Sequence, residues 1–381
     1  MSRRSSRTCL VLAIGALPAL AAEAPEGEPP AAKAAPARPA APEPAPPKPD
    51  APPAVAWVRA GPSGESPTWG TRGGLLWGLP SGLRPRDGPR GLIRLRYPTL
   101  PGDREDPGSF REDLINFIAI EPIVRGRRGF SELERSRLDD APGLRLVAED
   151  PGQAAARAPE DAPPFPPGRI ERLPSGVEVL SVAVRVERFE NGAHVRLLVS
   201  QRSDAPDEIE ISVRSEPGSA LMEYCILTAT MGNKARARRL WLADGYASSL
   251  DLYPGYQGDG FAPHAIFPLD RLRRTERGDV LAAITTDEAD PASVDPFPGR
   301  PGWRYAGVPV TQYWKKRAGS ARDDLHVAIN ARATYWLSRQ PIPGGVAIEN
   351  FEMRERFTEG QSFVFGITRK TPRELGSPTG E

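Results

Sequence analysis

Apolar and polar residues alternate with a period of two along much of the chain, which is typical of strands that bury one face. Between 208 and 214, isoleucine and valine alternate with glutamate, serine and arginine. A valine alternation over 177–186 is followed by Asn191-Gly192, a dipeptide that favours the tight turn of a β-hairpin. The apolar positions of 194–202 complete this predicted hairpin.

The same criteria predict further strands at 91–97, 115–124, 222–230, 280–286, 308–314, 325–337, 346–354 and 362–369. Helical spacing is found mainly at 131–138 and 233–242. The 44 prolines and 37 glycines also argue against a helical fold. The pattern therefore predicts an all-β protein, a large antiparallel β-sandwich with few short helices.

The first 21 residues have the organisation of a secretory signal peptide. Arginines precede an apolar stretch from Thr8 to Leu20, and Ala19-Leu20-Ala21 provides the small residues of a cleavage site. The stretch is shorter than the about 20 residues that span a bilayer, so we predict no membrane span. We expect an exported protein, located in the periplasm, in the cell envelope or outside the cell.

Composition divides the rest of the chain. Residues 22–54 are rich in proline and alanine, which predicts a disordered linker. A second such stretch, 149–168, is predicted to be a loop or connector. It separates a first β-rich part, 55–148, from the main β-sandwich part, 169–371, and these form either one sandwich or two domains. A flexible tail is expected at 372–381.

Charge and cysteine content exclude several function classes. The 50 Lys and Arg residues almost balance 49 Asp and Glu, whereas nucleic-acid binders usually carry a basic excess. Cys9 lies in the predicted signal peptide, so Cys225 remains alone and is expected to be a buried small hydrophobe. Three dispersed histidines predict no zinc site, and no cofactor motif is present. The acidic segment 287–295 either holds Ca²⁺ or forms an ordinary turn.

The loop 251–264 is the main candidate for a binding site, because Gly/Pro-rich loops on a rigid sheet often carry binding residues. Tyr253, Tyr256 and Phe261 offer flat aromatic faces, and Asp259 offers a carboxylate. These groups fit the C–H faces and hydroxyl groups of a sugar. The alternative is a compact loop that its own aromatic residues hold in place.

Basic and aromatic residues elsewhere extend this candidate site. The basic run 234–239 either binds the carboxylates or sulfates of an anionic polysaccharide or forms a solvated face. The basic run 125–129 allows the same two interpretations. Two aromatic doublets, at 313–314 and 335–336, lie in predicted strands, where one member of each should face outward. The further residues that we select for substrate binding are Arg236, Arg238, Arg239, Trp314 and Trp336.

In the C-terminal part, the apolar strand 345–349 ends in Glu349 and is followed by a last strand that begins after 357–361. Upstream, the segment 263–269 contains His264 and Phe267. This order resembles the closing strands and the His-x-Tyr-Phe segment of galactose mutarotase-like supersandwich proteins. The resemblance implies a supersandwich in which His264 is the general acid and Glu349 the general base at a sugar.

These observations favour a carbohydrate-active or carbohydrate-binding β-sandwich protein with a carbohydrate as partner. Mutarotation or hydrolysis would need an acid/base pair. Polysaccharide elimination would need a His or Tyr base, together with an Arg or Asn that neutralises the uronate. The alternatives are a non-catalytic envelope protein that binds or scaffolds partners, with 22–54 as its spacer, and an adhesion module that Ca²⁺ stabilises.

Overall fold

A computed structural model of the chain describes residues 55–61, 67–80, 90–101, 110–151, 165–231, 236–287, 310–335 and 339–376. All of these belong to one compact unit, Pro53–Glu381. The predicted signal peptide and linker, residues 1–54, lie outside the described residues.

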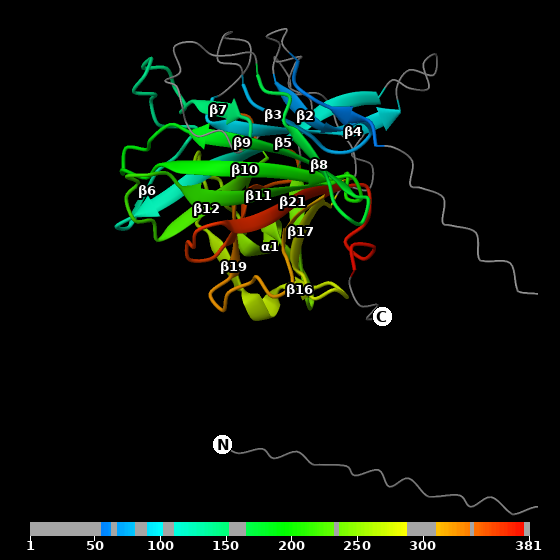
Figure 1. Cartoon of the computed structure of the whole chain (residues 1–381). Helices are drawn as coiled ribbons and strands as arrows, with labels where there is room; N and C mark the ends of the chain where they lie inside the picture. Colours follow the sequence, from blue (N-terminus) through cyan, green and yellow to red (C-terminus); the bar gives the residue numbers. More distant parts are fainter. Residues whose placement is uncertain are drawn as a thin grey trace, which may run out of the picture. The chain divides into compact units, whose positions relative to one another are not determined.

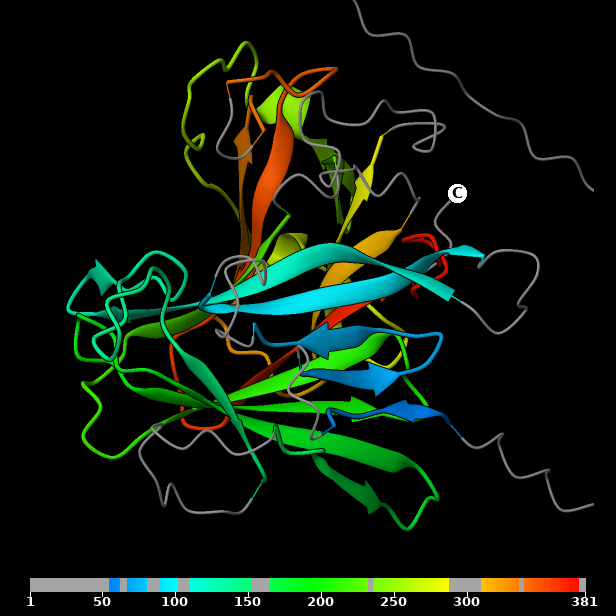
Figure 2. The same ribbon diagram turned by 90° about the horizontal axis from the view of Figure 1, so that it is seen from above.

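The described residues form two antiparallel sheets. The first has ten strands in the order β1-β2-β3-β4-β5-β12-β20-β19-β15, with β6 paired to β5. Its strands are β1 (Trp57–Val58), β2 (Thr68–Thr71), β3 (Leu76–Gly78), β4 (Leu92–Pro101), β5 (Phe110–Val124), β6 (Arg127–Arg128), β12 (Tyr224–Thr230), β15 (Ala265–Pro268), β19 (His326–Arg332) and β20 (Ala347–Arg354). Figure 2 shows β4 and β5 side by side in cyan.

The second sheet has eleven strands among the described residues, in the order β14-β13-β17-β18-β21-β11-β10-β9-β7, with β16 on β17 and β8 on β9. Its strands are β7 (Leu146–Glu149), β8 (Arg169–Arg172), β9 (Glu178–Val186), β10 (Val195–Arg202), β11 (Glu208–Ser215), β13 (Ala237–Leu242), β14 (Gly245–Ser248), β16 (Arg273–Arg274), β17 (Val280–Thr286), β18 (Thr311–Lys316) and β21 (Gln361–Thr368). Figure 1 shows β9, β10, β11 and β21 as neighbours.

One continuous apolar core joins the two sheets. Alternate residues of the central strands point into it, among them Ile118 and Phe351 of the first sheet and Ile211 and Phe365 of the second. Burial of such side chains is the main source of stability in a sandwich. The prediction of a large antiparallel β-sandwich with few helices is confirmed, since the described α-helix is the short α1 (Ser249–Leu252), beside a 3₁₀ turn, η3 (Leu269–Arg271).

Both predicted β-rich parts contribute to the same sandwich. Residues 55–148 supply β1 to β6 of the first sheet and most of β7 in the second, and the later residues supply all other strands. Strand β12, from the later part, pairs directly with β5 from the earlier one. The two parts are therefore one folding unit rather than two domains.

The predicted helix at 131–138 is wrong, because these residues form turns fixed to the first sheet. Ser131 is fully buried; its backbone N–H donates to Ile120 O at 3.1 Å, and its Oγ accepts from Ile120 N at 2.9 Å. The Ser131 hydroxyl also donates to Gly91 O. These tertiary hydrogen bonds replace the internal bonds of a helix.

The helix predicted at 233–242 is also wrong where it is described, since Ala237–Leu242 is strand β13. Pairing with β17 shifts register between Ala237 and Arg239, which marks a bulge. The buried apolar residues Ala237, Leu240 and Leu242 are therefore three and two positions apart. A spacing of three resembles helical periodicity, which explains the error.

The aromatic doublet Tyr313-Trp314 departs from the prediction that one of its members faces outward. Tyr313 and Trp314 are both buried, although adjacent strand residues point to opposite faces. Trp314 lies in the central core, whereas Tyr313 faces the other way and packs in a small cluster with Leu375. Residues 372–376 of the predicted flexible tail thus form a turn against the second sheet.

We expect Gly91→Ala to lower the free energy of unfolding by roughly 2–4 kcal/mol. Gly91 has φ +74°, and a Cβ there would lie 1.8 Å from Ser131 O. Gly126→Ala is the matched control, because Gly126 has φ +72° with nothing within 4 Å of the added Cβ. It should cost only about 1 kcal/mol. Urea denaturation of both variants measures the difference, and equal losses would contradict the steric argument.

Candidate functional site

A band of polar side chains lies on the face of the first sheet that points away from the core. Antiparallel pairing aligns Asn330 with Asn350 and Asn350 with Thr230; one step further along, Glu352 is aligned with Thr228. The residues between them point the other way and belong to the core: Ile329, Phe351 and Ala229. The alternation of the strands therefore places the polar side chains together on the outer face.

His264 lies at the edge of this band, directly before β15. Its Nε2 lies 3.6 Å from Glu352 Oε1 and 3.4 Å from Asn330 Nδ2. The imidazole is 29% exposed, whereas the Glu352 side chain is 0% exposed. Among the described residues, no hydrogen-bond partner contacts Nδ1 of His264. The ring thus has its described contacts at Nε2 and remains partly exposed.

Asn330 and Glu352 favour different tautomers of His264, because one faces Nε2 as a donor and the other as an acceptor. Asn330 Oδ1 accepts from Asn350 N at 3.1 Å, so its amide nitrogen faces the imidazole as a donor. Glu352, as a carboxylate, can only accept. Each neutral tautomer of His264 therefore finds a partner at Nε2, and Nδ1 is bare in one tautomer and protonated in the other.

Glu352 is surrounded by donors. Arg128 Nη2 lies 2.8 Å from Oε1, Thr228 Oγ1 donates to Oε1 at 3.1 Å, and Arg354 pairs with Oε2. Burial raises the pKa of a carboxyl group, but the hydrogen bond with His264 and the charges of Arg128 and Arg354 outweigh it and lower the pKa of Glu352 to about 2. Glu352 is therefore an anion at neutral pH.

Glu121 is a second carboxyl group in the same cluster. It lies on β5 opposite Ile226 and forms an ion pair with Arg128. Burial and the negative charge of Glu352 raise its pKa to about 7, against the opposing charge of Arg128. Two carboxyl groups around one guanidinium thus have pKa values displaced in opposite directions.

A tight hairpin places Arg128 between the two carboxyl groups. Strands β5 and β6 are joined by Arg125 and Gly126, at φ 49° and 72°, and Ile123 pairs with Arg128. Positive φ at both turn residues is the requirement of a two-residue hairpin of type I′. The basic run 125–129 is therefore divided: Arg125 and Arg127 are exposed, whereas Arg128 enters the cluster.

The predicted binding loop is partly held by its own aromatic residues. Tyr253 donates through its hydroxyl to Ile329 O at 3.0 Å, and Tyr253 and Tyr256 pack against a small cluster of Ala262, Ala331 and Val346. Phe261 is 49% exposed, and its ring centre lies 5.1 Å from the Arg332 guanidinium carbon. Asp259 is exposed as well. Of the four loop residues selected for substrate binding, Phe261 and Asp259 are thus the exposed ones.

Glu349, the carboxylate that the resemblance pairs with His264, occupies a bulge. The β19–β20 register shifts so that Asn350 faces Asn330 and Ile348 faces Ala331, which leaves Glu349 as the extra residue. Glu349 is buried, and its carbonyl oxygen accepts from Met231 N at 2.9 Å. The carboxylate that the structure brings to His264 is Glu352, three positions further along.

The selected arginines lie on β13 and in the turn before it. Arg238 is buried and donates to Asp287 Oδ1 at 2.9 Å and to the carbonyl oxygens of Pro343 and Val346. Arg236 is buried as well, and the guanidinium carbon of Arg239 lies 5.0 Å from the ring centre of Tyr246. Arg238 thus braces two loops, and it does not offer an open cationic face.

Of the two selected tryptophans, the structure describes Trp314, which does not join the band. Trp314 is fully buried, donates through Nε1 to Phe351 O at 2.8 Å and packs edge-on against Phe363 and Phe365. It is part of the core. Trp336 lies outside the described residues.

Two pockets lie on the second sheet, away from His264. One, of about 270 Å³, contains Glu208 and Glu210, which are engaged by Lys315 and by Arg317 respectively. In the part of the chain that the structure describes, no group of His, Cys, Asp and Glu residues is placed to hold a metal ion, and no helix has the length and apolar character to cross a membrane.

Comparisons with protein-family models, curated proteins and solved structures gave no match to this chain.

Proposed function

We propose that this chain is an exported carbohydrate-active protein in which His264 transfers a proton to or from a sugar. The observation that carries the proposal is the placement of the imidazole, with Nε2 beside buried Glu352 and Asn330 in a side chain that is still 29% exposed. A histidine oriented through one ring nitrogen and reactive through the other is the arrangement of proton-transfer sites in many enzymes.

The tautomer choice at Nε2 allows both directions of proton transfer. When Nε2–H faces Glu352, bare Nδ1 can accept a proton. When Nε2 accepts from Asn330, Nδ1–H can donate one. Buried Glu352 and Asn330 therefore act as positioning residues, and His264 is the group that would touch the substrate.

The surroundings of His264 suit a sugar. Phe261, three positions before it, presents an exposed ring on which the C–H face of a pyranose can pack. The exposed carboxylate of Asp259 on the same loop can accept hydrogen bonds from hydroxyl groups. The signal-like residues 1–21 and the Pro/Ala-rich segment 22–54 support export.

The position of the glutamates favours some reaction classes over others. Hydrolysis by two carboxyl groups requires both to reach opposite sides of one glycosidic bond. Glu121 and Glu352 are both buried and share Arg128. The site therefore supports proton transfer by His264 more than it supports hydrolysis. Elimination from a uronate polysaccharide needs such a base, whereas mutarotation of an aldose would need a second acid/base group beside it.

We expect His264→Gln to reduce turnover at least about 100-fold, the contribution of a general acid/base group. The full chain is assayed by polarimetry with aldoses and by ultraviolet absorbance with uronate polysaccharides. His326→Gln is the matched control, because His326 is a second half-buried histidine of the same sheet, with Nδ1 2.9 Å from Asp324 O. Turnover unchanged in His264→Gln, or lost equally in His326→Gln, would remove His264 from the mechanism.

A non-catalytic envelope protein that docks a partner is the second candidate. The observation that favours it is Ile266, which is 61% exposed two positions from His264 and close in sequence to exposed Phe261. Apolar side chains gathered on an open sheet face often mark a docking surface. Ile266→Ser should then abolish capture of the partner, whereas the enzyme proposal predicts little effect of this change on turnover.

A further inference from the structure

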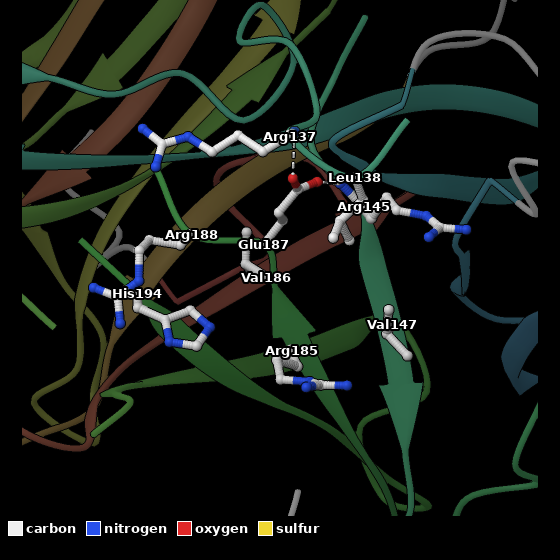
Figure 3. Close-up of a pocket in the computed structure, with 9 residues that line it drawn as sticks. All are labelled: Arg137, Leu138, Arg145, Val147, Arg185, Val186, Glu187, Arg188 and His194. Atoms are coloured by element: carbon white, nitrogen blue, oxygen red, sulfur yellow. Dashed lines mark hydrogen bonds between the residues drawn. The ribbon is translucent and has the colours of Figure 1, made fainter. Parts of the chain in front are cut away.

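A pocket of about 320 Å³ lies at the edge of the second sheet, between strands β7 and β9, the connection from β9 to β10, and the turns that follow Ser131. Basic side chains dominate its lining: Arg137, Arg145, Arg185, Arg188 and His194. Figure 3 shows these side chains arranged around Glu187 and Val186. We call this the basic pocket. It shares no residue with the band around His264.

One acid, Glu187, lines the basic pocket beside four arginines, and its carboxylate is hydrogen-bonded to the backbone. Glu187 Oε1 accepts from the backbone N–H of Arg137 at 2.7 Å, and Glu187 Oε2 accepts from the backbone N–H of Arg145 at 3.1 Å. Both carboxylate oxygens therefore hold the wall of the pocket in place.

Acids beside the basic pocket are shared with arginines outside it. Glu149 pairs with Arg185 at 2.9 Å and also with Arg196 at 2.7 Å. Asp139 lies 3.8 Å from Arg145 and pairs more closely with Arg90, at 2.9 Å. Each carboxylate thus serves two guanidinium groups, so positive charge is in excess.

Arg188 is fixed in position by neutral groups. Its Nη1 donates to the carbonyl oxygens of Gly192 at 3.2 Å and Gly218 at 2.9 Å. Backbone carbonyls orient a guanidinium without cancelling its charge. Arg137 is exposed. The basic pocket thus combines the guanidinium of Arg188, which hydrogen bonds hold in place, with the exposed guanidinium of Arg137.

His194 adds a buried nitrogen with unmet hydrogen-bonding capacity. Its Nδ1 is buried and has no hydrogen-bond partner among the described residues. Burial, then the charge of Arg188 and that of Arg185, lower the pKa of His194, while Glu216 opposes them. An unpaired buried polar atom is unfavourable, and a ligand that accepts a hydrogen bond from Nδ1–H would satisfy it.

We propose that the basic pocket binds an oxyanion group, a carboxylate, sulfate or phosphate, carried by a small ligand. Arginine suits this chemistry, because its planar fork donates two parallel hydrogen bonds to such groups. The volume of about 320 Å³ is in the range of small-ligand sites. A free inorganic ion and the acidic group of a sugar share the required chemistry.

The test is calorimetric titration of the full chain with inorganic sulfate, inorganic phosphate and glucuronate at low ionic strength. We expect Arg137→Gln to weaken binding by at least about tenfold, the loss of one charge-assisted contact. Arg135→Gln is the matched control: it removes the same charge from the same turn, and Arg135 is 65% exposed and bonded to Asp140 O. It should change the affinity less than about twofold.

Two further results separate the outcomes. His194→Gln should also weaken binding, with the melting temperature as a check on folding. Glucuronate that binds more tightly than sulfate and phosphate identifies an acidic sugar as the ligand, and the reverse order identifies a free ion. Absence of binding for all three probes, or equal weakening by Arg135→Gln and Arg137→Gln, would overturn the proposal.

Discussion

Replacing Lys316 by methionine is expected to lower the free energy of unfolding by about 3–5 kcal/mol. The Lys316 and Glu355 side chains are 3% and 1% exposed and pair directly. Lys316 Nζ also donates to Ser362 O at 2.9 Å and lies 4.3 Å from the ring centre of Phe363. The single substitution leaves Glu355 buried without its cation, which costs far more than the pair contributes.

Chemical denaturation of a double-mutant cycle measures this effect. Glu355→Met alone should be similarly destabilising, whereas Lys316→Met with Glu355→Met should recover most of the loss, because no charge remains to be desolvated. A loss below about 1 kcal/mol in Lys316→Met would be the behaviour of an exposed ion pair and would contradict the buried contact.

Replacing Glu121 by glutamine is expected to remove a pH dependence of stability between pH 4.5 and about pH 7. In the folded chain the pKa of Glu121 is raised from 4.5 to about 7, so the protonated form is favoured by folding. Its stabilising contribution is fully present below pH 4.5 and is lost as the pH rises through 7. The loss is on the order of 3 kcal/mol, since one pKa unit corresponds to about 1.4 kcal/mol.

Urea denaturation of the wild type and of Glu121→Gln at several pH values measures this difference. Glu352 has the opposite sign: its lowered pKa contributes stability above pH 4.5 that is lost as the pH falls toward 2. Exposed Glu171, on β8, provides the matched control, and Glu171→Gln should keep the wild-type pH profile. Identical profiles for wild type and Glu121→Gln would contradict the charge arrangement around Arg128.

The fold was predictable because strand alternation is a local property. Ile209, Ile211 and Val213 are all buried, as their spacing predicts. The alternation fails where tertiary structure intervenes: the bulge between Ala237 and Arg239 resembles helical spacing. No local signal shows that the segment around Leu375 returns to cover Tyr313.

The site was only partly predictable. His264 was identified from its loop, but its partner depends on the register of β19 and β20, and Arg128 is 224 positions from Glu352. A signal for the missed residues was present. Glu121 and Glu352 are glutamates inside apolar strands, and a charge in such a position requires a buried partner. The sequence contains no comparable signal for the basic pocket, because its arginines come from separate turns and strands.

The most direct test of the proposed function uses the three histidines of the chain. Imidazole ¹⁵N resonances of the full chain are recorded while cellohexaose or hexagalacturonate is added, with assignment from His264→Gln, His194→Gln and His326→Gln. The account predicts that one of these oligosaccharides shifts His264 in a saturable way and leaves His326 unchanged. A His264 resonance that neither oligosaccharide moves would contradict a sugar site at this histidine.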